Sequence, residues 1–293
     1  MEGNLSLNFS VNGTAIGAEW EMAPKWILAI STINNLLSLS LNIPHIIILY
    51  IMPAEKFLGA RNNRLMLIHI AALDIITSGI RLPLDNEYMQ YAMEKHHWFC
   101  GLTAVLGYGP HLVMEFVLVI GCIDRLIAVR HPFSYSQWFL PKHIAWFYLI
   151  PHVYWVTALT SITVIHEQTL LMPRGFVMCY YRPEGSQALL PLITGGLVLS
   201  MLTIFILYAI IIITVCMRRS ATARGEAGYA VQAVRIIMVI VITHLLLWIC
   251  APLKVFVQLA IGGPSKVLWY LAPLLAAFNS ATHPPIYGLL NRK

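Results

Sequence analysis

Seven long apolar stretches dominate this chain and constrain its fold more than any other feature. They lie near residues 25–52, 64–85, 98–130, 142–166, 187–217, 231–261 and 265–290. Each can cross a hydrocarbon layer about 30 Å thick, which takes roughly 20 helical residues. Only 11% of the 293 residues are charged, whereas a soluble domain carries about 25%. We therefore predict an all-α fold, a seven-transmembrane helix bundle in a lipid bilayer.

The same composition excludes several other classes of protein. A cytosolic enzyme, a disulfide-rich secreted module or a disordered chain would not be 58% hydrophobic. The stretches lack the alternation, in units of about ten residues, that a transmembrane β-barrel needs. The net charge of +6 does not indicate nucleic acid, because the basic residues are spread between the apolar stretches rather than gathered in a patch.

The basic residues also predict how the bundle is oriented in the plasma membrane. Of the 19 lysines and arginines, twelve lie on the side of the C-terminus and seven on the side of the N-terminus. Cytoplasmic loops carry the excess of basic residues, so we expect an extracellular N-terminus, residues 1–24, and a minimal cytoplasmic tail, residues 291–293. The glycosylation sequons at Asn4, Asn8 and Asn12 agree with this orientation.

Two of the five cysteines fall on the predicted outer side of the membrane, where disulfides persist. Cys100 opens the third span and Cys179 lies in the loop before the fifth. A bridge between them would close a loop of about 80 residues and contribute at most roughly 4–5 kcal/mol. Cys122, Cys216 and Cys250 fall within spans, where we expect them to behave as small apolar residues.

Charged residues stand together at the inner end of the third span, in the run Asp124-Arg125-Leu126-Ile127-Ala128-Val129-Arg130-His131-Pro132. An ionised pair at the membrane edge is expensive unless Asp124 and Arg125 neutralise each other or meet partners. Such a pair can act as a switch, since it is satisfied internally when closed and frees Arg125 for a partner when open. The simpler alternative is an anchor pair at the membrane surface.

This run resembles the Asp-Arg-Tyr region of rhodopsin-like (class A) G protein-coupled receptors. Arg125 follows Cys100 by 25 residues, the spacing between the outer cysteine and this arginine in that family. Further positions that match the family's motifs are Asn42, Asp74, Tyr208, Asn279, Pro284 and Tyr287. The resemblance covers the whole transmembrane body. It implies a receptor rather than an enzyme, which activates a heterotrimeric G protein through these residues and His283.

The chain departs from the family's pattern at several positions. Leu126 replaces the tyrosine after the arginine, and His283 replaces the asparagine before the proline of the seventh span. In the sixth span Cys250 stands two residues before Pro252, where the family has a tryptophan, and Trp248 lies half a turn away. These departures put the family's aromatic switch in doubt.

Prolines within the sixth and seventh spans predict kinks. Pro252 and Pro284-Pro285 remove backbone donors from their helices. Kinked helices beside the Asp124–Arg125 pair would form a bistable element that a ligand could bias from outside.

Ionisable side chains within the spans are candidates for function, because lipid makes them expensive. The candidate ligand-binding residues in the outer half of the bundle are Arg81, Gly107, Tyr108, His111, Glu115, Tyr180, Cys250, Lys254, Trp269 and Tyr270. Arg81, His111 and Lys254 would make this half cationic and suited to an anionic small molecule. Alternatively, Lys254 extends to the membrane surface, Arg81 reaches the interface and His111 is a satisfied bundle residue.

Glu115 is the deepest of these residues, ten positions before Arg125. A protonated Glu115 can pack in the bundle as a neutral side chain, whereas an ionised one needs a partner such as His111, Lys254 or His283.

Within the family, the chain resembles odorant receptors. The shared features are a glutamate midway along the third span, an Asp-Arg-x-x-Ala-x-x-His-Pro run and an Ile-Tyr-Gly-Leu ending. The single cysteine of the outer loop, Cys179, departs from that subfamily. Gly107 stands where amine receptors have an aspartate, and Leu275–Phe278 contains no lysine for retinal. We expect an odorant or other chemosensory receptor.

Two other classes of function are alternatives. A seven-helix intramembrane zinc hydrolase could use His69, Asp74, His111, Glu115, His244 and His283 as ligands. However, no His-Glu-x-x-His run occurs, and the receptor motifs would have no role, so we expect no metal and no cofactor. A membrane transporter would show an inverted repeat or paired broken helices, and neither is visible.

Overall fold

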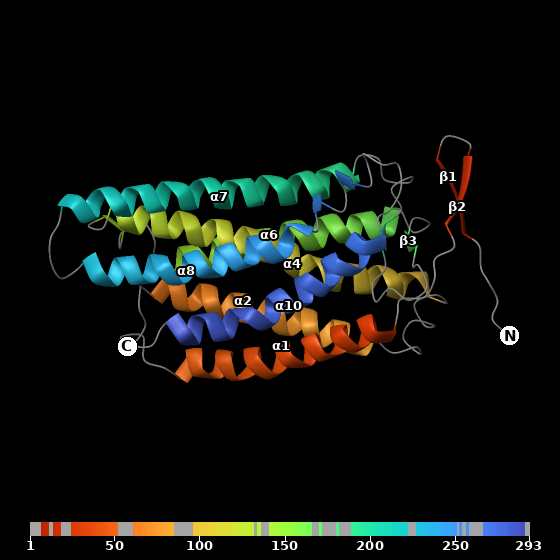
Figure 1. Ribbon diagram of the computed structural model, residues 1–293, viewed down its shortest axis with the longest axis horizontal. Coiled ribbons are helices and arrows are strands. Elements are labelled where there is room, and N and C mark those ends of the chain that lie inside the picture. The colour runs from red at the N-terminus through yellow and green to blue at the C-terminus, as the bar shows by residue number, and fades with distance from the viewer. Residues whose placement is uncertain are drawn as a thin grey trace.

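Seven long helices form an elongated bundle in the described part of the chain (Figure 1). They are α1 (Lys25–Ile51), α2 (Arg61–Leu84), α4 (His97–Arg130), α6 (Pro141–Ile165), α7 (Leu189–Ala221), α8 (Ala227–Trp248) and α10 (Lys266–Leu290). The computed structural model describes residues 7–11, 14–18, 25–51, 61–84, 96–131, 134–135, 141–165, 170–171, 180–181, 189–221, 227–250, 252–253, 256–257 and 266–290. The predicted seven-helix fold is confirmed.

The sixth helix is the one whose bounds differ most from the prediction. The other six begin and end within four residues of the predicted spans, and α10 continues as one helix through Pro284 and Pro285. The sixth span was expected at 231–261; α8 ends at Trp248, a turn follows at Ile249, and the described residues Cys250, Pro252–Leu253 and Phe256–Val257 are helical again. Pro252 explains this end, because it has no N–H to donate to the carbonyl of Trp248 and its ring clashes with that carbonyl.

The bundle is apolar on the outside, unlike a soluble protein, and its apolar core also buries polar side chains. Exposed apolar side chains on the outer faces include Ile47, Ile48, Phe147, Ile150, Phe205 and Ile206. Buried polar side chains include Asn42, Asp74, Ser78, Glu115, His244, Asn279 and His283. Lipid tails solvate the first set, whereas the second set must find partners inside the protein. Among the described residues, Trp26–Ile51, Arg64–Pro83 and Gly195–Met217 are long and apolar enough to cross a membrane by length and composition.

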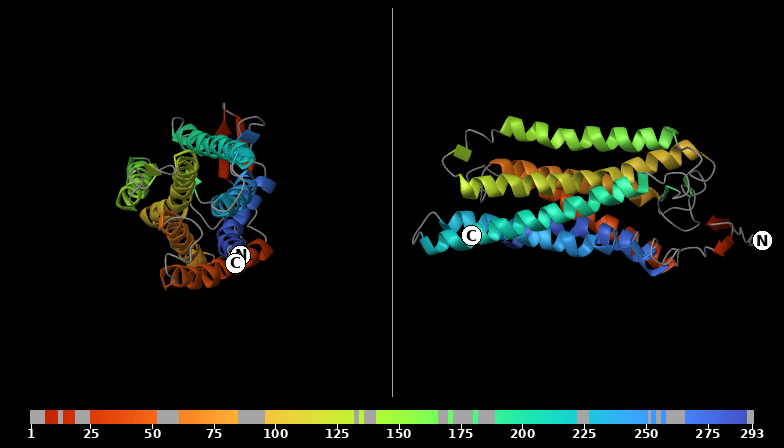
Figure 2. Two further views of the ribbon diagram at one scale, coloured as in Figure 1. Left: turned by 90° about the vertical axis from the view of Figure 1, so that its left-hand side faces the viewer. Right: turned by 90° about the horizontal axis from the view of Figure 1, so that it is seen from above.

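α4 lies at the centre of the bundle (Figure 2, left). It packs against α2, α6, α7 and α8, while α1 packs against α2 and α10. Gly121 lets α4 approach α2 closely, because a Cβ at this position would lie 2.3 Å from the sulfur of Met66. Residues along α4 can therefore contact most of the other helices.

Two short antiparallel hairpins were not predicted by the all-α assignment. The first joins β1 (Leu7–Val11) to β2 (Thr14–Ala18), and the second joins β3 (Leu170–Leu171) to β4 (Tyr180–Tyr181). Val11 pairs with Thr14, and the two residues between them in the sequence are Asn12 and Gly13. This dipeptide is the most favoured one in two-residue hairpin loops, so the sequence did contain the signal.

Candidate functional site

Asp124 and Arg125 form a buried ion pair at the C-terminal end of α4. The Arg125 Nε donates a hydrogen bond of 2.9 Å to Asp124 Oδ2, and Arg125 Nη2 donates a second one to the same oxygen. The hydroxyl of Tyr135 donates to Asp124 Oδ1 at 2.7 Å and accepts from Arg125 Nη2 at 3.1 Å. We call these three residues the Arg125 cluster. Its charges are matched internally, which is the closed arrangement that the sequence suggested.

Tyr135 was missed by the sequence analysis, and the two inner tyrosines that it named lie elsewhere. Tyr208 on α7 is buried near Cys122 and Arg125, and its hydroxyl has no hydrogen-bond partner among the described residues. Tyr287 on α10 is also buried and packs edge-on against His45, with ring centroids 5.4 Å apart. The tyrosine that bonds both members of the ion pair is instead Tyr135, which lies beyond the end of α4.

A second set of buried polar residues lies midway along the bundle, at the level of Glu115 on α4. The Nε2 of His244 on α8 lies 2.7 Å from Glu115 Oε1, and Asn279 Nδ2 on α10 lies 3.1 Å from His244 Nδ1. His244 was not among the three examples of a partner for Glu115 that the sequence offered. α8 crosses α4 at this level and presents His244 to the carboxylate, a long-range contact that the sequence does not encode locally.

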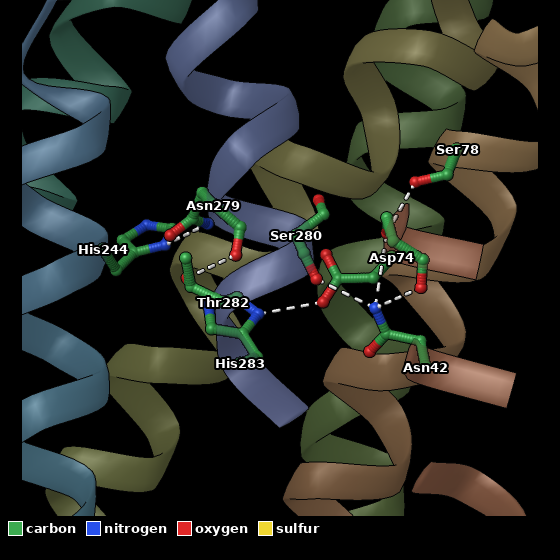
Figure 3. A network of polar contacts seen from close by, with 9 residues as sticks. Asn42, Asp74, Ser78, His244, Asn279, Ser280, Thr282 and His283 are labelled. Atoms are coloured by element: carbon green, nitrogen blue, oxygen red, sulfur yellow. Dashed lines mark hydrogen bonds and ion pairs between the residues drawn. The ribbon is translucent and has the colours of Figure 1, made fainter. Parts of the chain in front are cut away.

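His283 on α10 is the partner of another carboxylate. Its Nδ1 donates to Asp74 Oδ2 on α2 at 2.8 Å (Figure 3). The rings of His283 and His244 stack with centroids 6.3 Å apart and an interplanar angle of 21°. We call Asp74, Glu115, His244, Asn279 and His283 the mid-bundle cluster. It connects α2, α4, α8 and α10.

Asn42 extends this polar interior to α1. Its Nδ2 donates to the carbonyl of Ser280 on α10 at 2.8 Å and to the carbonyl of Ser38 at 3.0 Å. The hydroxyl of Ser78 on α2 donates to Ser38 Oγ at 2.8 Å (Figure 3). One asparagine side chain thus ties α1 to α10, while the serines tie α1 to α2.

On the outer side of the mid-bundle cluster lies an aromatic contact with His111. The rings of His111 and Trp248 are 4.8 Å apart, and Trp248 stacks on His244 at 5.9 Å. His111 is buried, and neither of its ring nitrogens has a hydrogen-bond partner among the described residues. Arg81 is buried and lies close enough to interact with His111 electrostatically.

The sequence profile of the seven-transmembrane receptors of the rhodopsin family matches residues 45–287. This chain belongs to that family. No curated protein matches the receptor. Rhodopsin-family proteins are signalling receptors and not enzymes, so the prediction of a receptor without enzymatic activity is confirmed and the zinc hydrolase is set aside. The receptor is a multi-pass membrane protein, and the family implies a ligand and a G protein as its partners in general.

The proposed zinc ligands of the hydrolase alternative do not come together in the receptor. No three His, Cys, Asp or Glu side chains of the described residues are arranged to hold a metal ion. His69 instead packs against Tyr148 and His152 of α6, at 5.1 and 4.8 Å. The other five residues include the two imidazole–carboxylate pairs described above, whose members bind each other.

Several predicted residues of the receptor lie outside the described part of the chain. They are Asn4, Asn12, Cys179 and Lys254. The backbone is described, but not the side chain, for Asn8, Cys100, Tyr108, Tyr180, Trp269 and Tyr270. Gly107 is buried and Cys250 is half-buried. The predicted Cys100–Cys179 disulfide therefore stays a prediction, while Cys122, Cys216 and Cys250 form no disulfide with a described residue.

Proposed function

We propose that this protein is a receptor that binds a small extracellular molecule in the outer half of its bundle and activates a heterotrimeric G protein at its cytoplasmic end. The observation that carries the proposal is the closed Arg125 cluster. A buried arginine whose charge is matched by a neighbouring aspartate is stable in the absence of a partner. A rearrangement that breaks the pair would free the guanidinium for a G protein.

The proposed site of action is the plasma membrane, with the N-terminus outside. Support comes from the excess of basic residues on the opposite side and from the sequons at Asn4, Asn8 and Asn12. A disulfide between Cys100 and Cys179 would fit the same orientation, since both cysteines then face an oxidising compartment.

We further propose that the ligand is an odorant or another chemosensory molecule with an anionic group. The sequence features shared with odorant receptors support the first part, and the buried Arg81 and His111 support the second. Both ring nitrogens of His111 are buried without a protein partner among the described residues. A buried polar atom without a hydrogen bond costs about 1–3 kcal/mol, and a ligand carboxylate would recover part of that.

The test of G protein activation uses cells that express a promiscuous G protein and a panel of carboxylic acids with neutral analogues. We expect Arg125→Ala to abolish activation while its surface expression equals that of the wild type. Arg130→Ala is the matched control, because this arginine is exposed on the same helix end and should leave signalling intact. Equal signalling by Arg125→Ala and the wild type would disprove the role of Arg125.

The test of the ligand class changes one polar side chain at a time. We expect Lys254→Met and His111→Phe to weaken carboxylate agonists at least about tenfold, which corresponds to about 1.4 kcal/mol, and to leave neutral agonists unaffected. Lys254→Arg keeps the charge and serves as the control. Unchanged potency of the carboxylates in Lys254→Met would mean that Lys254 extends to the membrane surface instead.

A further inference from the structure

Two polar side chains in the outer half of the bundle, Asn35 on α1 and Thr77 on α2, are buried without a hydrogen-bond partner. Each residue is 1% exposed. The Nδ2 of Asn35 and the Oγ1 of Thr77 have no partner among the described residues. A buried polar atom that is left unpaired destabilises a fold. Two such atoms on neighbouring helices therefore indicate a partner from outside the chain.

Residues of the same types elsewhere in the bundle are satisfied by the helices themselves. Asn42, about two turns along α1 from Asn35, donates to two backbone carbonyls. Thr203 and Thr214 each donate at 2.7 Å to the carbonyl four residues earlier in α7, which is the usual bond of a helical threonine. Thr77 makes no such bond to a described residue. Burial in a helix therefore does not by itself explain the unpartnered atoms.

The hydrogen bond between Ser38 and Ser78 fixes how α1 and α2 are aligned in this region. Ser78 Oγ donates to Ser38 Oγ at 2.8 Å (Figure 3), and the two helices run in opposite directions (Figure 1). Asn35 lies three residues before Ser38, and Arg81 lies three residues after Ser78. Both are therefore about 4.5 Å farther out than the two serines. The alignment places Asn35 and Arg81 at the same level of the bundle.

Thr77 and His111 lie near the same arginine. Thr77 shares one face of α2 with Arg81, because residues four positions apart in a helix are neighbours. Arg81 is 5% exposed, and its guanidinium is positively charged. His111 on α4 interacts with Arg81 electrostatically, and both of its ring nitrogens are buried without a partner among the described residues. Three helices thus place unpartnered polar atoms near one buried positive charge.

The chemistry of these groups favours an oxyanion. The amide nitrogen of Asn35 can only donate, a neutral imidazole has one N–H, and the hydroxyl of Thr77 is also a donor. A carboxylate accepts several hydrogen bonds with its two oxygens, and such charge-assisted bonds are stronger than those between neutral groups. The positive charge of Arg81 attracts an anion and repels a cation, and it does so strongly in an apolar interior.

We propose that Asn35 and Thr77 bind the carboxylate of a ligand between α1, α2 and α4. With Arg81 and His111 they form what we call the carboxylate subsite. The inference rests on the proposed function, because it completes the proposed anion site with two residues and with a helix, α1, that the sequence analysis did not assign to the ligand. Binding of a carboxylate does not itself need a G protein.

The variant Asn35→Leu separates binding from folding. It replaces an unpartnered donor by an apolar side chain, so the ligand-free receptor should melt at the same temperature as the wild type or at a higher one. An asparagine that stabilises the fold would give the opposite result. Asn42→Leu is the matched control on the same helix, since it removes bonds to two carbonyls. It should melt at a lower temperature but bind carboxylates as the wild type does.

The experiment measures the melting temperature of the purified full-length receptor in lipid nanodiscs with acetate, hexanoate or decanoate. The methyl esters of these acids and sodium chloride are the controls. A ligand that binds the folded receptor raises its melting temperature in a saturable manner. We expect at least one acid to do so and its ester not. In Asn35→Leu and in Thr77→Val, the acid concentration that gives half of the shift should rise at least about tenfold, because a hydrogen bond to a charged group is lost.

The three acids also show where the ligand comes from. A shift with acetate or hexanoate would indicate an acid taken from water, and a shift with decanoate alone would indicate an acid taken from the bilayer. Both results support the carboxylate subsite. If no acid raised the melting temperature more than its ester, the proposal would be overturned, and water would be the partner of these polar atoms.

The variants provide a second way to overturn the proposal. Half-saturation at the same acid concentration in the wild type, Asn35→Leu and Thr77→Val would show that neither side chain binds the carboxylate. Should Asn35→Leu fail to fold, Asn35→Asp keeps the shape of the side chain and brings a negative charge beside Arg81. This variant should lose the shift with acids, and an unchanged shift would again overturn the proposal.

Nucleotide exchange on a G protein, measured in the same nanodiscs, separates this inference from the proposed function. An acid that stabilises the wild type, but not Asn35→Leu, without changing exchange would support the carboxylate subsite and contradict the proposed receptor activity. An acid that changes exchange with equal potency in the wild type, Asn35→Leu and Thr77→Val would support the proposed function and overturn the subsite.

Discussion

The Arg125 cluster and the mid-bundle cluster both bury a carboxylate beside a basic side chain, but they are built differently. Asp124 and Arg125 are adjacent in sequence, and Tyr135 follows within eleven residues. The partners of the mid-bundle cluster are 129 and 209 residues apart. The first cluster therefore joins one helix end to the segment that follows it, whereas the second holds four helices together.

The two clusters also differ in the kind of charge that they use. The Arg125 cluster pairs its carboxylate with an arginine, which is protonated at every accessible pH. The mid-bundle cluster pairs its carboxylates with imidazoles, in which one ring nitrogen of the neutral form donates and the other accepts. We expect mutations in the Arg125 cluster to change signalling more than stability, and mutations in the mid-bundle cluster to change both.

The largest expected effect on stability comes from Asp74→Ala. This change leaves the imidazole of His283 buried without its partner, and removal of one member of a buried pair costs about 3–5 kcal/mol. The free energy of unfolding of the purified receptor measures it. The double variant Asp74→Leu/His283→Leu removes both partners and should recover most of the loss. If single and double variants were equally stable, the pair would not be what holds α2 to α10.

Asp124→Asn should have the opposite profile, with a large effect on signalling and a small one on unfolding. It removes the counter-charge of Arg125 while keeping the shape of the side chain. We expect basal nucleotide exchange to rise about tenfold, which corresponds to about 1.4 kcal/mol, and the unfolding free energy to fall by less than in Asp74→Ala, because the asparagine keeps an oxygen that accepts from Arg125. Asp124→Glu keeps the charge and is the control. A large loss of stability without increased exchange would contradict the distinction between the clusters.

The sequence predicted what is local in this receptor. Long apolar stretches decide the seven helices, because only helices and closed barrels satisfy their backbone within lipid. The Asp124–Arg125 pair could also be recognised, because its two members are adjacent in the sequence. Even Pro252 indicated correctly where the sixth helix would be disturbed, although its effect begins at Trp248, four residues earlier.

What depends on helix packing was not predictable from one sequence. Glu115 had several candidate partners, and the choice of His244 depends on how α8 is rotated against α4, which no local pattern encodes. The pairing of His283 with Asp74 likewise depends on how α10 packs against α2, although the sequence analysis named both residues as candidates. Tyr135 was missed because it lies beyond the end of α4, outside the predicted spans.

Asn42→Leu tests whether the mid-bundle polar interior stabilises α1 as well. The change removes the hydrogen bonds to the carbonyls of Ser280 and Ser38 and should cost about 1–2 kcal/mol of unfolding free energy. Ser40→Ala on the same helix is the control, because the exposed Ser40 bonds only the carbonyl of Leu37 and should change stability by less than about 0.5 kcal/mol. Similar losses of unfolding free energy in Asn42→Leu and Ser40→Ala would show that the hydrogen bond between α1 and α10 stabilises the receptor no more than an exposed bond within α1 does.

The smallest of the four expected effects belongs to Tyr135→Phe, and it examines the Arg125 cluster from its outer member. The change removes the hydroxyl that bonds both charged partners but leaves their ion pair intact. We expect basal exchange to rise roughly fivefold, which corresponds to about 1 kcal/mol. Because Tyr135 acts through Asp124, the double variant Asp124→Asn/Tyr135→Phe should resemble Asp124→Asn alone. Fully additive effects would mean that Tyr135 acts independently of the ion pair, and the cluster would then be two separate contacts.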